Sequence, residues 1–228
     1  NAADFTTNYT QHTRSDAAPE IRVMTVYMFP SITPSSSTFE LVTNTRTFQS
    51  PLTNSVQTAS RKGSLWKISM RFNNLSGNDR AIMQGFLAKM NGQQHRMYLH
   101  DHSAVKRGIA PDPADTLVVN SAGQTGSTLV ASGATGSQTG YLKAGDYISF
   151  NNELHMVTDD CNSTGSNTVS IPIAPPIRKP TETTNSQDVI DYLQPIFGVF
   201  MLSSATSWDT QPGIVSNFTV EAVEDVLA

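Results

Sequence analysis

The chain has only one cysteine, Cys161, among its 228 residues. A single cysteine can form neither an internal disulfide nor a metal site built from several thiolates. No apolar run approaches the roughly 18 residues of a membrane-spanning helix, and residues 1–14 contain no apolar core. The sequence therefore predicts no membrane insertion and, as it stands, no signal peptide. Stability is expected from packing, from oligomerisation, or from both.

Charged side chains are also scarce, at 15% of the residues, and the formal net charge is −4. Basic residues come together at most in pairs, such as Arg61-Lys62 and Lys106-Arg107. Proteins that bind nucleic acid tightly usually carry a basic stripe that neutralises phosphates. The sequence thus argues against sequence-specific nucleic-acid binding, although a mildly acidic surface suits a passage through which DNA slides without sticking.

The apolar fraction is only 38%, and uncharged polar residues, glycine and proline make up the balance. Side chains of this kind suit exposed sheet faces and long turns. Such a composition is common in β-rich extracellular or virion proteins and less common in metabolic enzymes. The expected fold class is mainly β.

Several segments carry strand patterns. Residues 65–72 alternate strictly between apolar and polar side chains, so one face of this strand is expected to be buried. Residues 21–29 form a dense β-type run, and residues 38–49 mix β-branched and aromatic side chains as a strand or a hairpin would. Two or three further strands are expected between residues 196 and 223, around Trp208.

One packed helix is expected, over about residues 78–91. Residues 76–78 provide N-cap candidates, Asp79 favours the helix dipole, and Gly92 is well placed beyond the last turn. An apolar stripe at helical spacing consists of Ile82, Met83, Phe86, Leu87 and Met90. A short strand at residues 96–99 follows, and the helix is expected to pack across the sheet.

The middle of the chain has a different character, because glycine, serine, threonine and alanine dominate its first half. Asn151-Asn152 is a good hairpin-turn signal between two short strands. Residues 107–178 are therefore expected to form a small all-β module inserted into a larger domain. That domain is expected to comprise residues 21–106 and 179–228, preceded by a polar N-terminal arm at residues 1–20.

His100-Asp101-His102 is the most suggestive polar cluster in the sequence. Alternating histidines on a strand can bind a metal ion from one face, and Asp101 could bind the ion or orient a histidine ligand. Further ligands would have to come from residues such as His95 or His155, and nothing in the sequence fixes either one. The preferred interpretation is a polar turn that leaves the strand at residues 96–99.

The remaining polar features carry no catalytic signature. Asp159-Asp160-Cys161 lacks the regular spacing of a calcium loop, and residues 133–140 lack the lysine and the helix of a phosphate-binding loop. No Gly-x-Ser-x-Gly elbow occurs, and no two carboxylates stand in a context that identifies a glycosidase pair. The sequence therefore assigns no catalytic, cofactor-binding or metal-binding residue and no cofactor, and it predicts a protein that is not an enzyme.

A family resemblance rests on five segments in a fixed order. They are residues 142–150 (LKAGDYISF), residues 154–159 (LHMVTD), residues 169–178 (VSIPIAPPIR), Trp208 and residues 218–224 (FTVEAVE). Together they resemble the distal tail proteins, or baseplate hub ring proteins, of long-tailed (siphovirus-type) bacteriophages. The resemblance covers most of residues 40–226.

The resemblance implies a β-sandwich-like ring domain that assembles as a homo-hexamer around the tail axis. Residues 107–178 would be a peripheral β-barrel-like module. The ring would join the tail tube protein to the tail-tip hub protein and offer a platform for fibres or receptor-binding proteins. Its location would be the virion, at the tail tip, after synthesis in the host cytoplasm. Exposed strands and the polar arm at residues 1–20 would pair heterologous surfaces of neighbouring subunits.

Three alternatives stay open. Another tail structural protein, of the tube or of tail completion, would use the same β elements. A carbohydrate-binding module at residues 107–178 would need an exposed aromatic platform, for which only Tyr141 and Tyr147 are candidates there. Trp66 and Trp208 could also stack on sugars, although core packing or a subunit contact is preferred for both. A tail-associated hydrolase would need acidic or histidine side chains that converge in a cleft, and the sequence nominates none.

Overall fold

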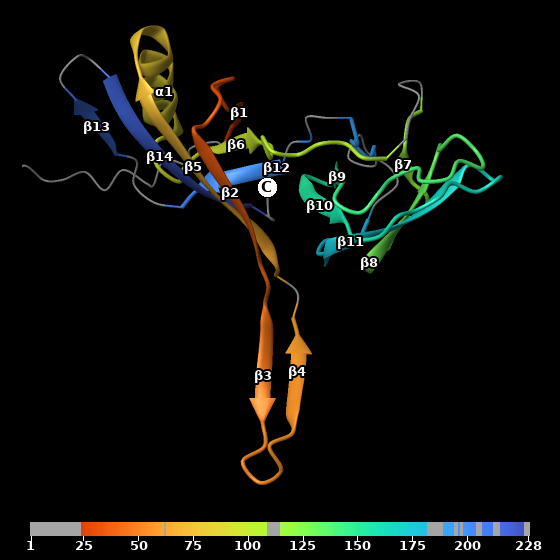
Figure 1. Ribbon diagram of the computed structural model, residues 1–228. Coiled ribbons are helices and arrows are strands. Elements are labelled where there is room, and N and C mark those ends of the chain that lie inside the picture. Colours follow the sequence, from red (N-terminus) through yellow and green to blue (C-terminus); the bar gives the residue numbers. More distant parts are fainter. Residues whose placement is uncertain are drawn as a thin grey trace, which may run out of the picture.

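The computed structural model describes most of the chain, and within that part it contains three sheets and one helix (Figure 1). The described residues are 24–61, 63–108, 115–181, 189–193, 196, 198–203, 207–211 and 215–225. The predicted N-terminal polar arm at residues 1–20 lies outside them. The expectation of a mainly β fold is confirmed.

The largest sheet joins strands from both ends of the chain in the order β1-β6-β12-β14-β5-β2, with β13 also paired to β14. Its strands are β1 (Val26–Met28), β2 (Ser36–Val42), β5 (Leu65–Leu75), β6 (Arg96–Leu99), β12 (Gly198–Leu202), β13 (Trp208–Gln211) and β14 (Val215–Glu224). Only the pairing of β1 with β6 is parallel among these seven strands.

Strand β5 is central to this sheet because it pairs with both β2 and β14. Its even-numbered apolar side chains are buried in the first hydrophobic core, with Ile68, Met70 and Phe72 fully enclosed. The alternating pattern thus predicted the strand and its buried face correctly. The strand continues three residues beyond the predicted end, to Leu75.

The single described helix, α1 (Gly77–Met90), begins after Ser76 and agrees with the prediction to within one or two residues. Four residues of the expected stripe are buried on the sheet: Met83, Phe86, Leu87 and Met90. Ile82 differs, since 43% of its side chain remains exposed at the margin of the stripe. Asn91 caps the helix with a left-handed backbone (φ 47°), and Gly92, which the sequence placed just beyond the last turn, follows it and is also left-handed (φ 66°). Asparagine tolerates this conformation better than other non-glycine residues.

Residues 38–49, which the sequence left as a strand or a hairpin, divide between two strands. Strand β2 belongs to the large sheet, whereas β3 (Thr45–Gln49) pairs only with β4 (Val56–Ser60) as a separate two-stranded ribbon. Figure 1 shows this ribbon extending away from the rest of the molecule. Residues 45–60 are called the projecting hairpin below.

The second large sheet has the order β7-β8-β11-β10-β9. Its strands are β7 (Val118–Val119), β8 (Gly126–Ser132), β9 (Tyr147–Phe150), β10 (Glu153–Val157) and β11 (Thr168–Ile177). The predicted hairpin turn between β9 and β10 is confirmed, because Asn151 (φ 56°) and Asn152 (φ 61°) are both left-handed, as a two-residue turn of type I′ requires.

A later segment partly closes the second sheet. Val189 forms a bridge with Val118 in the edge strand β7, and Asp191 forms a bridge with Ser149 in the opposite edge strand β9. Between them Ile190 is buried in the second hydrophobic core. This segment was expected in the larger domain, which was predicted to resume at residue 179. It packs with the inserted strands instead, because its apolar side chain completes their core.

The two large sheets share a contact region. Tyr147 and Leu154 belong by sequence to the second sheet, yet both side chains pack into the first core beside Trp66 and Phe200. The β-rich body therefore has two cores that meet at one junction. No helix in the described part of the chain is long and apolar enough to cross a membrane.

Candidate functional site

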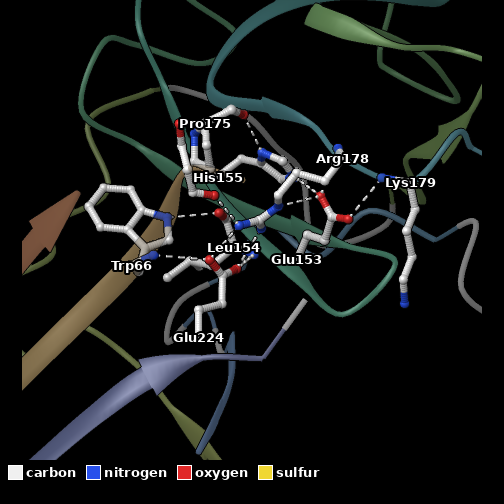
Figure 2. Close-up of polar contacts among 9 residues, drawn as sticks. Trp66, Glu153, Leu154, His155, Pro175, Arg178, Lys179 and Glu224 are labelled. Carbon is white, nitrogen blue, oxygen red and sulfur yellow. Dashed lines mark hydrogen bonds and ion pairs between the residues drawn. The ribbon is translucent and has the colours of Figure 1, made fainter. Parts of the chain in front are cut away.

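A charged cluster lies buried at the junction of the two large sheets (Figure 2). Glu153 begins β10, Arg178 follows the end of β11, and Glu224 ends β14. The exposed fractions of their side chains are 1%, 5% and 0%. Charged side chains are almost never buried this fully unless they pair with one another.

Arg178 supplies the positive charge of this cluster. Its Nη1 and Nη2 each donate a hydrogen bond of 2.8 Å to one carboxylate oxygen of Glu224. Its Nε donates to Oε2 of Glu153 at 3.1 Å, and Nη1 also donates to the carbonyl oxygen of Ser64 at 2.7 Å. The bidentate pair has the geometry in which arginine and carboxylate interact most strongly. One side chain of the second sheet is thus bonded to two segments of the first.

Backbone groups also donate hydrogen bonds to the same two oxygens of Glu224. Oε2 accepts from the backbone N–H of Trp66 at 3.1 Å, and Oε1 accepts from that of Leu154 at 2.9 Å. The indole Nε1 of Trp66 donates to the carbonyl oxygen of Leu154 at 2.8 Å. Trp66 is therefore a core residue that connects the two sheets, as its apolar neighbours predicted, and it cannot stack on a sugar.

His155 completes the cluster from the other side of Glu153. Its Nδ1 lies 2.8 Å from the carbonyl oxygen of Pro175, which can only accept, so Nδ1 donates. Its Nε2 lies 3.4 Å from Oε2 of Glu153, and its ring stacks on Phe150 at 4.6 Å between centroids. Since His155 is fully buried here, it is not available as the metal ligand that the sequence considered.

The environment of Glu153 favours its charged form. Burial acts to raise the pKa of this carboxyl group, but the close approach of the His155 ring and the hydrogen bond and positive charge of Arg178 outweigh burial and hold the pKa below its usual range. Burial likewise acts to lower the pKa of Arg178, and its bonds to Glu224 and Glu153 raise it above the ordinary value. The buried cluster therefore favours the charged forms of both Glu153 and Arg178.

A pH dependence of stability follows from Glu153. Because its folded pKa lies below the unfolded value of about 4.3, the carboxylate stabilises the protein above that pH, and the contribution is lost as pH falls through the folded pKa. Urea unfolding measured between pH 3 and pH 7 is expected to show a shallower acid loss in Glu153→Gln than in the unchanged protein. Equal slopes would contradict this assignment.

His100-Asp101-His102 forms a polar turn after β6, as preferred from the sequence. Oδ1 of Asp101 accepts from the backbone N–H and the hydroxyl of Ser103, and Oδ2 accepts from the hydroxyl of Tyr147 at 3.1 Å. The rings of His100 and His102 lie 4.3 Å apart. Nowhere in the described part of the chain do three or more histidine, cysteine or acidic side chains gather in a group that could hold a metal ion.

The two histidines line a pocket beside the β1–β6 edge of the large sheet. The cavity measures about 500 Å³. Its lining consists of Met28, Phe29, Pro30, Ser31, Ile32, Thr33, Leu99, His100 and His102. Burial, together with the neighbouring His102, lowers the pKa of His100, and burial lowers the pKa of His102. Both rings are therefore mainly neutral at pH 7, and this histidine pocket is a hollow without formal charge.

The projecting hairpin also exposes apolar side chains. Phe48, Leu52 and Val56 are 57%, 94% and 61% exposed. The described side chains of β3 and β4 are otherwise polar or small and are also exposed. A two-stranded ribbon on its own is marginally stable in water. The chain thus presents a long, weakly supported element that carries three apolar side chains.

The other candidates from the sequence have structural roles. Asp160 accepts a hydrogen bond from the backbone of Ala144, and Cys161 is buried, where burial raises the pKa of its thiol. Tyr141 and Tyr147, the only candidates in residues 107–178 for the aromatic platform of the alternative carbohydrate-binding interpretation, are only 1% and 6% exposed, so neither offers a face to a ligand. Trp208 differs from Trp66, since 43% of its side chain is exposed on β13.

Comparisons with known proteins add no assignment. No protein-family model matches this chain, and no curated protein sequence is significantly similar to it.

Proposed function

We propose that the chain is a structural subunit that assembles into a ring, and that this ring is the distal tail (baseplate hub) protein of a long-tailed bacteriophage. The observation that carries the proposal is the projecting hairpin. Its two outer edges offer unpaired backbone groups, and its apolar side chains lie in water. Such an element gains stability when it is covered by a partner.

A second copy of the same chain is the partner that a ring requires. Ring assembly uses heterologous contacts, in which one surface of a subunit meets a different surface of the next. The projecting hairpin supplies one such surface, far from the bulk of the large sheet (Figure 1). A homo-hexamer around the tail axis is the assembly that the family resemblance implies.

The two large sheets would have separate tasks in this assembly. The seven-stranded sheet with α1 would form the β-sandwich-like ring domain and contact the tail tube and the tail-tip hub protein. The partly closed five-stranded sheet would be the peripheral β-barrel-like module and carry fibres or receptor-binding proteins. The buried cluster of Glu153, Arg178 and Glu224 supports this division, because it fixes the module to the ring domain.

Negative-stain electron microscopy of the purified full chain tests the proposal. Class averages are expected to show closed rings with six-fold symmetry and a central lumen. Rings that stack into long tubes without other proteins would favour a tail tube protein instead. Particles of single-chain size at concentrations used for assembly would contradict any ring-forming role.

A further inference from the structure

We infer that His155 is a second cation of the buried cluster, with a proton on both ring nitrogens at pH 7, and that loss of one proton weakens the junction of the two large sheets. The junction is thus a pH-sensitive connection, firm at neutral pH and weaker in alkaline solution. The inference concerns the folded single chain, so it does not depend on the proposed ring.

Both nitrogens of the His155 ring face oxygens that accept hydrogen bonds. Nδ1 donates to the carbonyl oxygen of Pro175 at 2.8 Å. Nε2 lies 3.4 Å from Oε2 of Glu153 and is buried without a hydrogen-bond partner in the described part of the chain. In a neutral ring whose Nδ1 donates, Nε2 carries only a lone pair. That lone pair would face a carboxylate with both side chains almost completely buried, whereas a protonated Nε2 forms an ion pair.

The proton of this pair belongs to the ring and not to Glu153. Oε2 of Glu153 accepts from the backbone N–H of Arg178 at 3.3 Å and from its Nε at 3.1 Å. Oε1 accepts from the backbone N–H of Lys179 at 3.2 Å. These donors favour the ionised carboxylate, in agreement with its lowered pKa. Figure 2 shows the amine of Lys179 directed away from the ring of His155.

The sum of the buried charges leads to the same conclusion. Glu224 accepts two hydrogen bonds from Arg178 and one from each of two backbone N–H groups, as an ionised carboxylate does. Two carboxylates and one guanidinium leave an excess negative charge among side chains that are at most 5% exposed. Burial of a charge without compensation is costly. An imidazolium at His155 brings the sum to zero.

The strands beside β10 bring no charged side chain toward the ring, because β9, β11 and β12 contain none. The titratable Tyr147 of β9 directs its hydroxyl to Asp101. Asp191 lies beyond β9, on the side away from β10. Glu153 and Arg178 are therefore the charged groups that act most directly on the ring.

The proposed charge fixes the sign of a pH effect. The free energy of unfolding falls as pH rises wherever the folded protein binds more protons than the unfolded chain. An unfolded histidine releases its proton near pH 6.5, at about its ordinary pKa. The contribution of a protonated His155 is therefore fully present below about pH 6.5 and is lost at higher pH. A buried neutral ring would act oppositely, because stability would then rise from about pH 5 to pH 7.

Urea unfolding of the unchanged chain and of His155→Asn, from pH 5 to pH 9, measures this sign. The amide nitrogen of asparagine can take the place of Nδ1, so the bond to Pro175 is kept while the titrating group is removed. Other ionisable groups are common to both proteins and cancel in the comparison. From pH 6 to pH 9, the unfolding constant of the unchanged chain is expected to rise about tenfold or more relative to that of His155→Asn.

His95→Asn is the matched control, because His95 contacts the backbone of Thr25 in an exposed setting, away from the cluster. This variant is expected to keep the alkaline loss of the unchanged chain. A loss that disappears in His95→Asn and persists in His155→Asn would overturn the inference. A stability difference between the unchanged chain and His155→Asn that rises from pH 5 to pH 7 would also overturn it.

Nuclear magnetic resonance of the histidine rings in the unchanged chain tests the charge directly, whether or not His155→Asn folds. Nuclear Overhauser contacts to the stacked ring of Phe150 identify His155 among the five histidines. At pH 7 the nitrogen chemical shifts are expected to show protons on both Nδ1 and Nε2. A proton on one nitrogen alone would overturn the inference and leave the proposed ring untouched.

Discussion

Arg178→Ala is expected to lower the free energy of unfolding by about 3–5 kcal/mol. The substitution deprives the buried carboxylates of Glu153 and Glu224 of the guanidinium that they share, and their side chains are only 1% and 0% exposed. It also removes the hydrogen bond to the carbonyl oxygen of Ser64. The loss far exceeds that of an exposed arginine, since water can replace the partners of an exposed charge but not those of a buried one.

Urea unfolding at pH 7, followed by circular dichroism, measures this loss. Arg71→Ala is the matched control, because Arg71 is exposed on β5, and its effect is expected to stay within about 0.5 kcal/mol. A loss below about 1 kcal/mol for Arg178→Ala would mean that water reaches the cluster, and would contradict its role as the connection between the sheets.

The same variant tests whether the two sheets unfold together. Trp66 fluorescence reports on the first core and the junction, and the reaction of the buried Cys161 thiol reports on the second core. Both probes are expected to give one midpoint in the unchanged chain. In Arg178→Ala the Cys161 thiol is expected to react at a lower urea concentration than that at which Trp66 fluorescence changes, because the buried cluster no longer connects the two sheets.

Phe72→Ala is expected to lower the free energy of unfolding by about 3–5 kcal/mol. Phe72 is fully buried in the first core, where its ring stacks on Phe29 at 5.9 Å between centroids. Truncation removes apolar contacts and leaves a cavity that the neighbouring rings cannot fill. Urea unfolding of the monomer measures the cost directly.

Phe48→Ala is the matched control, since it is the same change on the projecting hairpin. Phe48 is 57% exposed, so the free energy of unfolding is expected to change by no more than about 0.5 kcal/mol. Equal destabilisation by the two substitutions would contradict the assignment of Phe48 to a surface outside the core.

Local patterns predicted the parts of the fold that depend on local physics. The alternation through Trp66, Ile68 and Met70 identified β5 and its buried face, because successive side chains of a strand point to opposite sides. The pair Asn151-Asn152 identified the hairpin between β9 and β10, because few other residues adopt its left-handed backbone. Neither inference needed knowledge of distant segments.

The buried cluster was missed, although part of its signal was visible. Phe218, Val220 and Ala222 are every second residue of β14 and point to its buried face. Glu224 follows in the same alternation, so a buried and therefore paired carboxylate was foreseeable there. Its partner was not, because Arg178 lies 46 residues away and is brought close only by the packing of the two sheets. Long-range ion pairs of this kind leave no spacing rule in a single sequence.

The projecting hairpin was missed for a related reason. Residues 45–60 have the β-branched and polar side chains of an ordinary strand pair, and only the absence of a third strand beside them in the described structure distinguishes them. Strand pairing is decided by the whole sheet, so the sequence left residues 38–49 as either a strand or a hairpin. The histidine pocket likewise depends on two segments, after β1 and after β6, that are distant in sequence.

The native mass of the purified full chain, measured by light scattering over a wide range of concentration, tests the central claim most directly. The account predicts a discrete assembly of six chains that dissociates on dilution without intermediate sizes, as a closed ring with one repeated contact would. A chain that stays monomeric at every concentration, or that grows without limit, would contradict assembly into a ring.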